Sequence, residues 1–464
     1  MLSLIRFLGK EVFSVAQIVA SVIFITMFVL IVLEVFDRHI VTLLSGAAVI
    51  LFVFGLCMHS PQAIWRTLNL GGFAQSSFWY GESSETSSGI NWSTIVFILG
   101  MMIMVEGMGM SGFFRWLCLR IAKAVHYKKT ALLVCFMIMS SILAMFIDSI
   151  TVILFLAAVT AELGRTLGFN PVPMIISEIF CANLGGAATM CGDPPNIIVG
   201  TSLGLTFFDF LSNTGVIVAI CLVFTVLYFY LCFRKKLGEE GEPPKNLESP
   251  RSAITNVRAF TVSVVIFLCV VVLLITHAQT TLTVSAIGVI ASVLTFTGTV
   301  FTFGKKGISY IVKHIDYKTL LFFTGLFVAV GGLEETGVLE LIASFIEKVS
   351  GGSTAIIVVI VLWLSAAASA FVDNIPFAAT MVPVVQLMAQ RGIDLHVLAW
   401  ALSLGTDLGG NATPIGASAN VVGTSVAAKE GHPVSWGTYC KYCVPATLMV
   451  VTVSMLCIFV KYIF

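Results

Sequence analysis

The chain has 464 residues, of which 58% are hydrophobic and only 11% are charged, and its mean hydropathy is +1.02. A soluble globular domain carries about 25% charged residues, so this composition excludes a soluble core and favours an all-α polytopic membrane protein. The formal net charge of +1 gives no indication of nucleic-acid binding.

Eight apolar segments of about 20 residues are each long enough to cross a bilayer as a helix. The first is longer than a signal-peptide core and no cleavage pattern follows it, so we expect a retained transmembrane helix. The eight predicted spans are 12–35, 40–58, 93–110, 213–233, 259–277, 282–302, 319–335 and 442–463.

Four further apolar regions do not read as simple spans. Regions 130–166 and 354–390 are apolar on both sides of a polar tip, which is typical of a re-entrant hairpin. Regions 173–205 and 395–427 are interrupted by Gly, Pro and Asn, which predicts a broken helix.

Basic residues set the orientation. Segments 111–129, 234–258 and 303–318 are rich in Lys and Arg, so the positive-inside rule places them in the cytoplasm. With these three inside, 130–166 must enter and leave from the cytoplasmic side and 354–390 from the outside. Both termini are then extracytoplasmic, and we expect a bacterial cytoplasmic (inner) membrane protein.

The two halves of the chain repeat each other. The same residue type occurs again 225 positions later for Thr94, Gly100, Gly112 and Asp148. It occurs again 224 positions later for Gly185, Gly186, Thr189, Gly192 and Asn196. Each half has five crossings, about 10 in all. Because five is an odd number, the second half starts on the other side of the membrane and is inverted relative to the first. We therefore expect a first inverted repeat over 1–233, a cytoplasmic linker over 234–258 and a second repeat over 259–464, with a binding site at the midplane.

The hairpin tips carry acids in apolar surroundings. The first reads Asp148-Ser149-Ile150-Thr151 and the second Asp373-Asn374-Ile375-Pro376. A carboxylate at bilayer depth costs roughly 2.5 kcal/mol or more unless it is paired, protonated or solvated. Each acid can cap the second arm of its hairpin, contact an ion, or do both.

The broken helices carry the other polar groups. In the first, Pro194 and Pro195 follow Gly192 and Asp193 and must unwind the helix. In the second, Pro414 and Gly416 act in the same way. The hinge positions are Gly185, Gly186, Gly192, Pro194, Pro195, Gly409, Gly410, Pro414 and Gly416.

Four aspartates, Asp148, Asp193, Asp373 and Asp407, lie in these elements, and no Lys or Arg does. Bound Na⁺ or H⁺ must therefore neutralise the site, with Na⁺ expected near Asp148, Asn196, Asp373 and Asn420. The candidate ion- and substrate-binding residues are Asp148, Ser149, Thr151, Asn183, Thr189, Asp193, Asn196, Asp373, Asn374, Asp407, Asn411, Thr413, Ser418 and Asn420.

Other acids have simpler interpretations. Glu162 and Arg165 are three residues apart on one helix, which predicts a salt bridge. Glu178 lies near a helix end, where we expect it to be solvated or paired. The 11 cysteines lie mostly in apolar runs, and Cys440 and Cys443, which form the one C-x2-C pair, have no His cluster beside them. We predict no zinc site and no cofactor.

The motifs Gly192-Asp193-Pro194-Pro195-Asn196 and Asp373-Asn374-Ile375-Pro376, with Asn183-Leu184-Gly185-Gly186, resemble the ion transporter superfamily in its arsenite-permease/P-protein branch, which includes citrate-transporter-like members. The resemblance implies an elevator-type carrier that is a homodimer, with a scaffold and a moving transport domain. Related dicarboxylate carriers have Ser-Asn-Thr at both tips, and the acidic tips here resemble the P-protein and sodium/proton-antiporter members instead.

Three functional classes follow. The first is a secondary active transporter of a small ion coupled to H⁺ or Na⁺, either a sodium/proton antiporter or a cation-coupled permease for arsenite, another inorganic oxyanion or a carboxylate. An ion channel is the alternative from another class. An intramembrane enzyme would need paired His, Glu-x-x-His or Ser–Lys groups at membrane depth, and the sequence has none.

Overall fold

The computed structural model describes residues 14–33, 35–81, 89–238 and 248–463. Within these ranges most of the chain is helical, and its β-type pairing is the isolated bridge between Tyr80 and Leu282. The predicted all-α class is therefore confirmed. Arg6 and Lys10, whose positive charges oppose an extracytoplasmic N-terminus, lie outside the described residues.

Nine described helical segments are long and apolar enough to cross a membrane. Eight overlap the predicted spans: α2 (Val15–Val32), Arg38–Cys57 (α3, Arg38–Ala48, continued by a π-helix), α5 (Trp92–Ser111), Phe207–Phe233 (α11, Phe207–Phe210, and α12, Val216–Phe233), α13 (Val257–Thr280), α14 (Val284–His314), α15 (Tyr317–Glu335) and α21 (Trp436–Tyr462). The ninth is α8 (Ser149–Leu167), the second arm of the first predicted hairpin.

The hairpin and broken-helix regions each consist of two helices. Region 130–166 contains α7 (Lys129–Ala144) and α8, and region 354–390 contains α17 (Thr354–Ser369) and α18 (Asn374–Gln390). Region 173–205 contains α9 (Val172–Gly186) and α10 (Pro194–Leu203), and region 395–427 contains α19 (Leu395–Gly409) and α20 (Ser418–Lys429). The chain therefore leaves the helix at the polar motif in all four regions.

Short helices also occur outside the predicted spans, hairpins and broken helices. These are α4 (Pro61–Leu68), α6 (Phe113–Ala124) and α16 (Val338–Ser350), and α14 runs on to His314 through a kink at Gly304. On α6 the buried residues Phe114, Cys118 and Ala122 recur every four positions, whereas Arg120 and Lys123 are exposed. Such helices are amphipathic and too short to register as spans.

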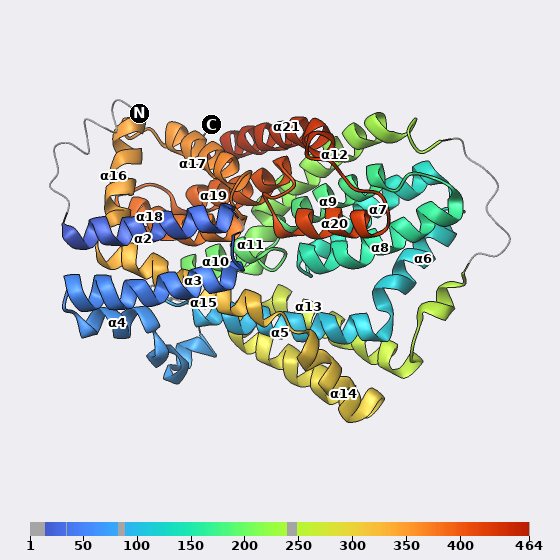
Figure 1. Ribbon diagram of the computed structural model, residues 1–464, viewed down its shortest axis with the longest axis horizontal. Helices are drawn as coiled ribbons and strands as arrows, with labels where there is room; N and C mark the ends of the chain where they lie inside the picture. The colour runs from blue at the N-terminus through green and yellow to red at the C-terminus, as the bar shows by residue number, and fades with distance from the viewer. Residues whose placement is uncertain (1–13, 34, 82–88, 239–247, 464) are drawn as a thin grey trace.

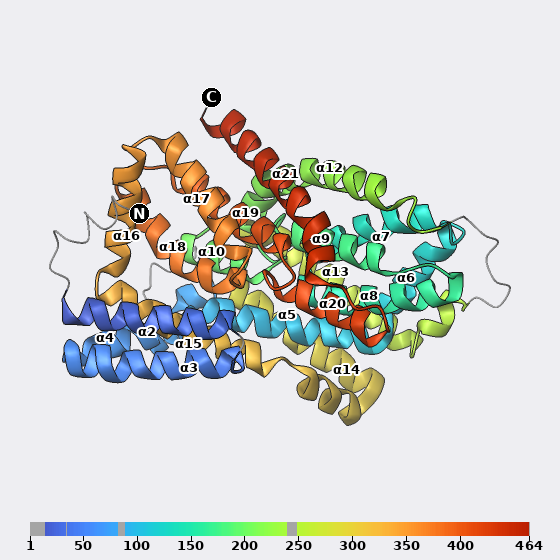
Figure 2. The same cartoon turned by 45° about the horizontal axis from the view of Figure 1, so that its top comes forward.

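The helices form two groups (Figures 1 and 2). One group contains α2–α5 and α13–α15, in which α5 packs on α14 and α3 packs on α15. The other contains α7–α10, α12 and α17–α21. In Figure 1 the first hairpin, α7–α8, and the second, α17–α18, lie toward opposite ends of the long axis.

The same helix pairs pack together in both halves of the chain. The broken-helix segment α9 packs on α7, and α19 packs on α17. A Cβ atom added at Gly185 would lie 2.1 Å from the Ser141 carbonyl oxygen, and one at Gly409 would lie 2.3 Å from the Ala366 Cα. These two glycines let the backbones approach, which accounts for their recurrence in the sequence.

The predicted salt bridge between Glu162 and Arg165 is wrong. Glu162 pairs with Arg115 of α6, at 2.8 Å, and Arg165 pairs with Glu430. Of the two settings expected for Glu178, solvated or paired, the structure has the paired one: the residue is fully buried, and its Oε1 accepts a hydrogen bond of 2.6 Å from the Thr160 hydroxyl. In both cases the partner lies on another helix, so spacing along one helix could not identify it.

Candidate functional site

The first hairpin tip is tied both to its own helix and to the neighbouring broken helix. Asp148 is the N-cap of α8 and accepts hydrogen bonds from the Thr151 backbone N–H (2.9 Å) and hydroxyl (2.7 Å). The next residue, Ser149, donates from its hydroxyl to Oδ1 of Asp193 at 2.6 Å. Asp148 therefore acts as a cap, while Ser149 connects the tip to the break between α9 and α10.

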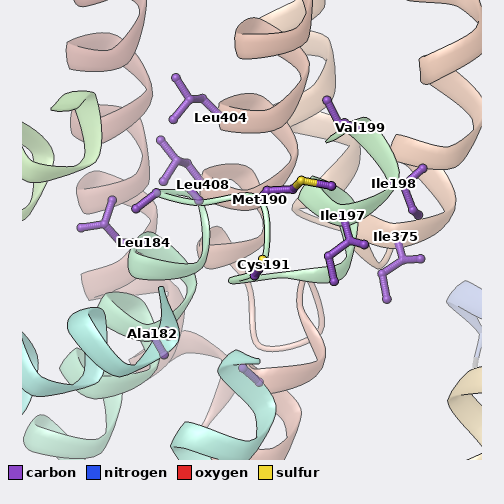
Figure 3. Packing of buried hydrophobic residues seen from close by; sticks show 14 of the residues in the cluster. Ala182, Leu184, Met190, Cys191, Ile197, Ile198, Val199, Ile375, Leu404 and Leu408 are labelled. Carbon is purple, nitrogen blue, oxygen red and sulfur yellow. The ribbon is translucent and has the colours of Figure 1, made fainter. Parts of the chain in front are cut away.

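The break in the first broken helix is spanned by one side chain. The Asn196 Nδ2 donates to the carbonyl of Gly186 (3.0 Å), the last residue of α9, and to that of Thr189 (3.1 Å) in the unwound segment. The Thr189 hydroxyl donates to the carbonyl of Met145 beside the first tip. Apolar side chains surround this loop, including Met190, Cys191, Ile197, Ile198 and Ile375 (Figure 3).

The second break is built in the same way. The Asn420 Nδ2 donates to the carbonyls of Gly410 (2.7 Å) and Thr413 (2.8 Å). The Thr413 hydroxyl donates to the carbonyl of Ala370, next to the second tip. Each broken helix is thus fastened to the tip of the hairpin that precedes it.

The two broken helices meet through carboxamides. Asn183 of α9 donates from Nδ2 to the side-chain oxygens of Asn411 (2.9 Å) and Asn420 (2.7 Å). All three side chains are buried. The Asn183 Oδ1 and the Asn411 Nδ2 are buried and have no hydrogen-bond partner in the ranges that the structure describes. This contact joins residues more than 200 positions apart and brings both repeats to one centre.

Two buried aspartates lie at this centre, one from each broken helix. Asp193 is 2% exposed and Asp407 is fully buried. The Asp407 carboxylate lies beside the side chains of Asn196 and Asn374 and within electrostatic reach of Asp193. Within the described part of the chain, Asp193 Oδ2 and both carboxylate oxygens of Asp407 have no hydrogen-bond partner. Buried oxygens of this kind are strong acceptors for a proton or a hard cation.

The residues at the corresponding positions of the other repeat are not acidic. Asp407 corresponds to Asn183, and Asp193 corresponds to Ala417. The corresponding contacts are nevertheless kept, because Asn183 faces Asn420 as Asp407 faces Asn196. Each repeat therefore supplies one carboxylate to a frame of asparagines.

The second hairpin tip differs from the first because it has a basic partner. Arg38, the first residue of α3, contacts Oδ2 of Asp373 through Nη1 at 2.7 Å. Asp373 also caps α18 and accepts a hydrogen bond from the Ser418 hydroxyl at 3.0 Å. The expectation of a site free of basic side chains is therefore wrong at this tip. Arg38 lies 335 positions from Asp373, so the sequence gives no sign that the two residues meet. Its one sequence signal is that it is a basic residue at the edge of an apolar span.

The proposed hinge residues lie at the ends of the helices rather than in left-handed turns. Gly186 and Gly409 end α9 and α19, and Pro194 and Pro195 are the first residues of α10, a position that suits proline. None of the predicted hinge glycines has a positive φ. The remaining hinge positions, in or beside the two unwound segments, are Gly185, Gly192, Gly410, Pro414 and Gly416.

A cavity of about 830 Å³ opens beside the first break. Met190 of the broken loop and Thr201 and Ser202 of α10 line one wall. Pro383 and Gln386 of α18 also line the cavity, together with residues from α13 to α16, including His277, Glu334 and Glu340. The cavity therefore lies between the two helix groups. No cluster of three or more His, Cys, Asp or Glu residues suited to a metal ion occurs in the described ranges.

Comparison with known proteins agrees with this architecture. The 46 kDa membrane protein of Mycobacterium leprae is 33% identical over 386 residues, which cover 82% of this chain and 88% of that protein. The human P protein is 28% identical over 446 residues, covering 79% of this chain and 53% of that protein. This chain thus spans about half the length of the P protein.

Two solved structures share the fold at low sequence identity. The YdaH transporter of Alcanivorax borkumensis aligns with a TM-score of 0.56 at 14% identity, covering 88% of this chain and 90% of that one. Neisseria gonorrhoeae MtrF, described with a class of antimetabolite efflux pumps, aligns with a TM-score of 0.57 at 13% identity, covering 98% of this chain and 96% of that one.

A family model described as Citrate transporter, CitMHS, matches residues 28–405, which is well over half of the chain. The resemblance of the motifs to the ion transporter superfamily is thereby confirmed. The chain belongs to the CitMHS citrate transporter family and is a membrane transporter, not an enzyme.

Proposed function

We propose that the protein is a secondary active transporter that moves a small ion coupled to H⁺ or Na⁺. The observation that carries this proposal is the pair of buried carboxylates, Asp193 and Asp407, three of whose four oxygens have no hydrogen-bond partner among the described residues. A binding step at this pair would link ion occupancy to the packing of both broken helices.

The electrostatics of the pair favour a bound cation or proton. The charges that act on Asp193 are those of Asp148 and Asp373, and the charge that acts on Asp407 is that of Asp193. Among the described residues, neither acid forms an ion pair with a basic group. Each unneutralised carboxylate in a buried site costs several kcal/mol. A bound proton or Na⁺ would remove this cost by neutralising the negative charge.

The substrate that best fits the family is citrate or a related carboxylate, because the family model carries that description. An anion could enter this acidic centre only together with bound cations, which is the physical basis of symport. Sodium/proton exchange is the second candidate. It is favoured by the lack of a basic partner at Asp193 and Asp407.

The arrangement of the helices supports elevator-type alternating access through two inverted repeats. The group with the hairpins and broken helices would move, and the group with α3, α5, α14 and α15 would serve as the scaffold. The cavity between the two groups reaches Met190 of the first break. We take it as the access route in this state, and the channel alternative would instead require a continuous pore.

The setting that we propose is the bacterial cytoplasmic membrane, with both termini outside and a homodimer as the assembly. Lipid contact is supported by the outer helices. Large apolar side chains of α2 and α13, such as Ile25 and Val272, are more than half exposed. In water such surfaces would be costly, whereas a bilayer or a second copy covers them.

Reconstituted proteoliposomes test this function. Internal pH and substrate uptake would be followed while Na⁺, K⁺, citrate, arsenite, phosphate and sulfate are supplied in turn. We expect saturable, cation-dependent transport by the native protein. We also expect a loss of at least about a hundredfold in Asp193→Asn and in Asp407→Asn, because the carboxylate charge is removed while its shape is kept.

A matched control is Glu347→Gln, which removes an exposed acid paired with Arg391 on the surface. This variant should transport at the native rate. Full activity in both Asp193→Asn and Asp407→Asn would overturn the site. Non-saturating flux at channel-like rates would overturn the class of transporter.

A further inference from the structure

Arg38 belongs to one helix group but binds the other. On its own side it donates from Nη2 to the Thr319 hydroxyl at 3.3 Å, and its guanidinium lies 5.3 Å from the centre of the Phe322 ring. Both of these residues are on α15, which packs against α3. The arginine is therefore held by the proposed scaffold.

Its other nitrogen, Nη1, crosses to the group that carries the hairpins. Nη1 lies 2.7 Å from Asp373 Oδ2 at the second tip and 2.7 Å from the Ser418 Oγ at the start of α20. The Asp373 side chain is largely buried, at 12% exposed. A carboxylate and a hydroxyl at this separation are hard oxygen ligands of the kind that bind a small monovalent cation. Nη1 thus occupies the position of a cation.

The first tip lacks this arrangement. Asp148 corresponds to Asp373, but its hydrogen bonds go to Thr151 of its own helix. The ion pairs between described residues include none with Asp148. Thr94, the equivalent of Thr319, bonds to Thr201 of α10 and holds no arginine. The positive charge is therefore specific to the second tip.

We propose that Arg38 is a tethered substitute for the coupling cation at Asp373 and Ser418, and that a monovalent cation binding there must displace it. This inference rests on the proposed function and adds a cation position at the second tip, separate from the Asp193–Asp407 pair, and the residue that competes for it. The competitor is fixed to α3 and α15, so it can reach Asp373 only in the relative position of the two helix groups seen here.

Displacement would couple ion binding to movement. With Arg38 in place, the salt bridge joins the second hairpin to the proposed scaffold. When Na⁺ or a proton takes the Asp373 carboxylate, the pair loses its attraction and the hairpin is released. Arg38 is thus a positioning residue that sets the apparent affinity for the cation and restrains the empty carrier.

The test measures cation binding without transport. Purified protein in detergent would be melted over a series of Na⁺ concentrations at constant ionic strength, with choline as the balancing ion, and over a pH series without Na⁺. In Arg38→Gln we expect the half-saturating concentration of the active cation to fall about tenfold, since a charge-assisted competitor is gone. Arg38→Lys keeps the charge and should stay near the native value.

Two further variants complete the design. In an Asp373→Asn background, Arg38→Gln should produce no additional shift, because the two residues act through one contact. Thr319→Val leaves both site residues intact but weakens the anchor of Arg38 on α15, and should lower the half-saturating concentration about threefold. This variant provides the measurement if Arg38→Gln does not fold.

Native half-saturation in both Arg38→Gln and Thr319→Val, on the Na⁺ and the pH axes alike, would overturn the inference. In that result the native protein still responds to the cation, so the proposed function stands. A native protein that shows neither cation-dependent melting nor transport would instead remove the proposed function, and the inference with it.

Discussion

Asn196 and Asn420, 224 residues apart, make the same pair of hydrogen bonds in the two broken helices. Each side-chain amide donates to one glycine carbonyl at the start of its break and to one threonine carbonyl within the break, at distances from 2.7 to 3.1 Å. Both residues are fully buried. Each amide therefore replaces the helical hydrogen bonds that the proline-containing segment cannot make.

Replacing either asparagine by alanine should destabilise the protein. Asn196→Ala leaves the carbonyls of Gly186 and Thr189 without this donor, and Asn420→Ala does the same at Gly410 and Thr413. Two unsatisfied buried acceptors cost about 1–3 kcal/mol each. Melting in detergent should show a clear drop in Tm for both variants. Thr424→Ala is the control, because its hydroxyl bonds only to carbonyls of its own helix. A control that melts as low as Asn420→Ala would contradict this account.

Asp148 and Asp394 allow capping to be separated from ion binding. Both are helix N-caps that accept from the backbone N–H three residues on, at 2.9 Å and 3.1 Å. Asparagine caps a helix about as well as aspartate, so neither Asp→Asn variant should lose much stability. Transport should fall strongly only in Asp148→Asn, which removes a carboxylate from the hairpin tip. Uptake assays at matched protein amounts measure this, and equal activity in the two variants would leave Asp148 as a cap alone.

Much of the architecture could be predicted from the sequence because its signals are local. Long apolar runs marked eight of the nine candidate spans. The Asp193-Pro194-Pro195 string marked a break, since two prolines remove donors wherever they lie. Polar residues within apolar runs marked the tips, because such residues are costly unless a cavity or a partner receives them.

The sequence could not predict side-chain partners that lie on different helices. Arg38 reads as an ordinary basic residue at a span boundary, and only the packing of α3 beside the second tip brings it to Asp373. Glu178 of α9 likewise has its hydrogen-bond partner on another helix, Thr160 of α8. The asymmetry between the two tips is therefore a property of the tertiary structure. The sequence does not show it, because both tips have an aspartate at the corresponding position.

Close helix packing can be tested at a pair of glycines. A Cβ at Gly185 would lie 2.1 Å from the Ser141 carbonyl oxygen, whereas a Cβ at Gly437, within α21, would meet no atom within 4 Å. Gly185→Ala must push α9 away from α7 and should lower stability by about 1–3 kcal/mol. Gly437→Ala should be neutral or slightly stabilising, because alanine favours helix. Melting curves distinguish the two, and equal Tm values would mean that α9 can shift without cost.

The end of the linker offers a test by pH. Glu248 lies against Arg115 of α6, which also holds Glu162 at 2.8 and 2.9 Å. The hydrogen bond and charge of Arg115 lower the pKa of Glu248 below its ordinary value of 4.5. A lowered pKa means that the contact stabilises the docked linker fully above pH 4.5, and that this stabilisation is lost as the pH falls through the lowered value.

The contact is partly exposed, so its contribution should be about 0.2–1 kcal/mol and should weaken in high salt. Hydrogen exchange at residues 249–254, corrected for the intrinsic pH dependence of amide exchange, should increase a few-fold between pH 7 and about pH 3.5. Glu248→Gln should show the faster exchange already at pH 7 and little further change on acidification, because its side chain no longer titrates. Glu347→Gln should leave exchange in this segment unaltered, since its partner Arg391 belongs to another surface. Exchange that quickens equally with acid in native protein and in Glu248→Gln would assign the opening to a different group.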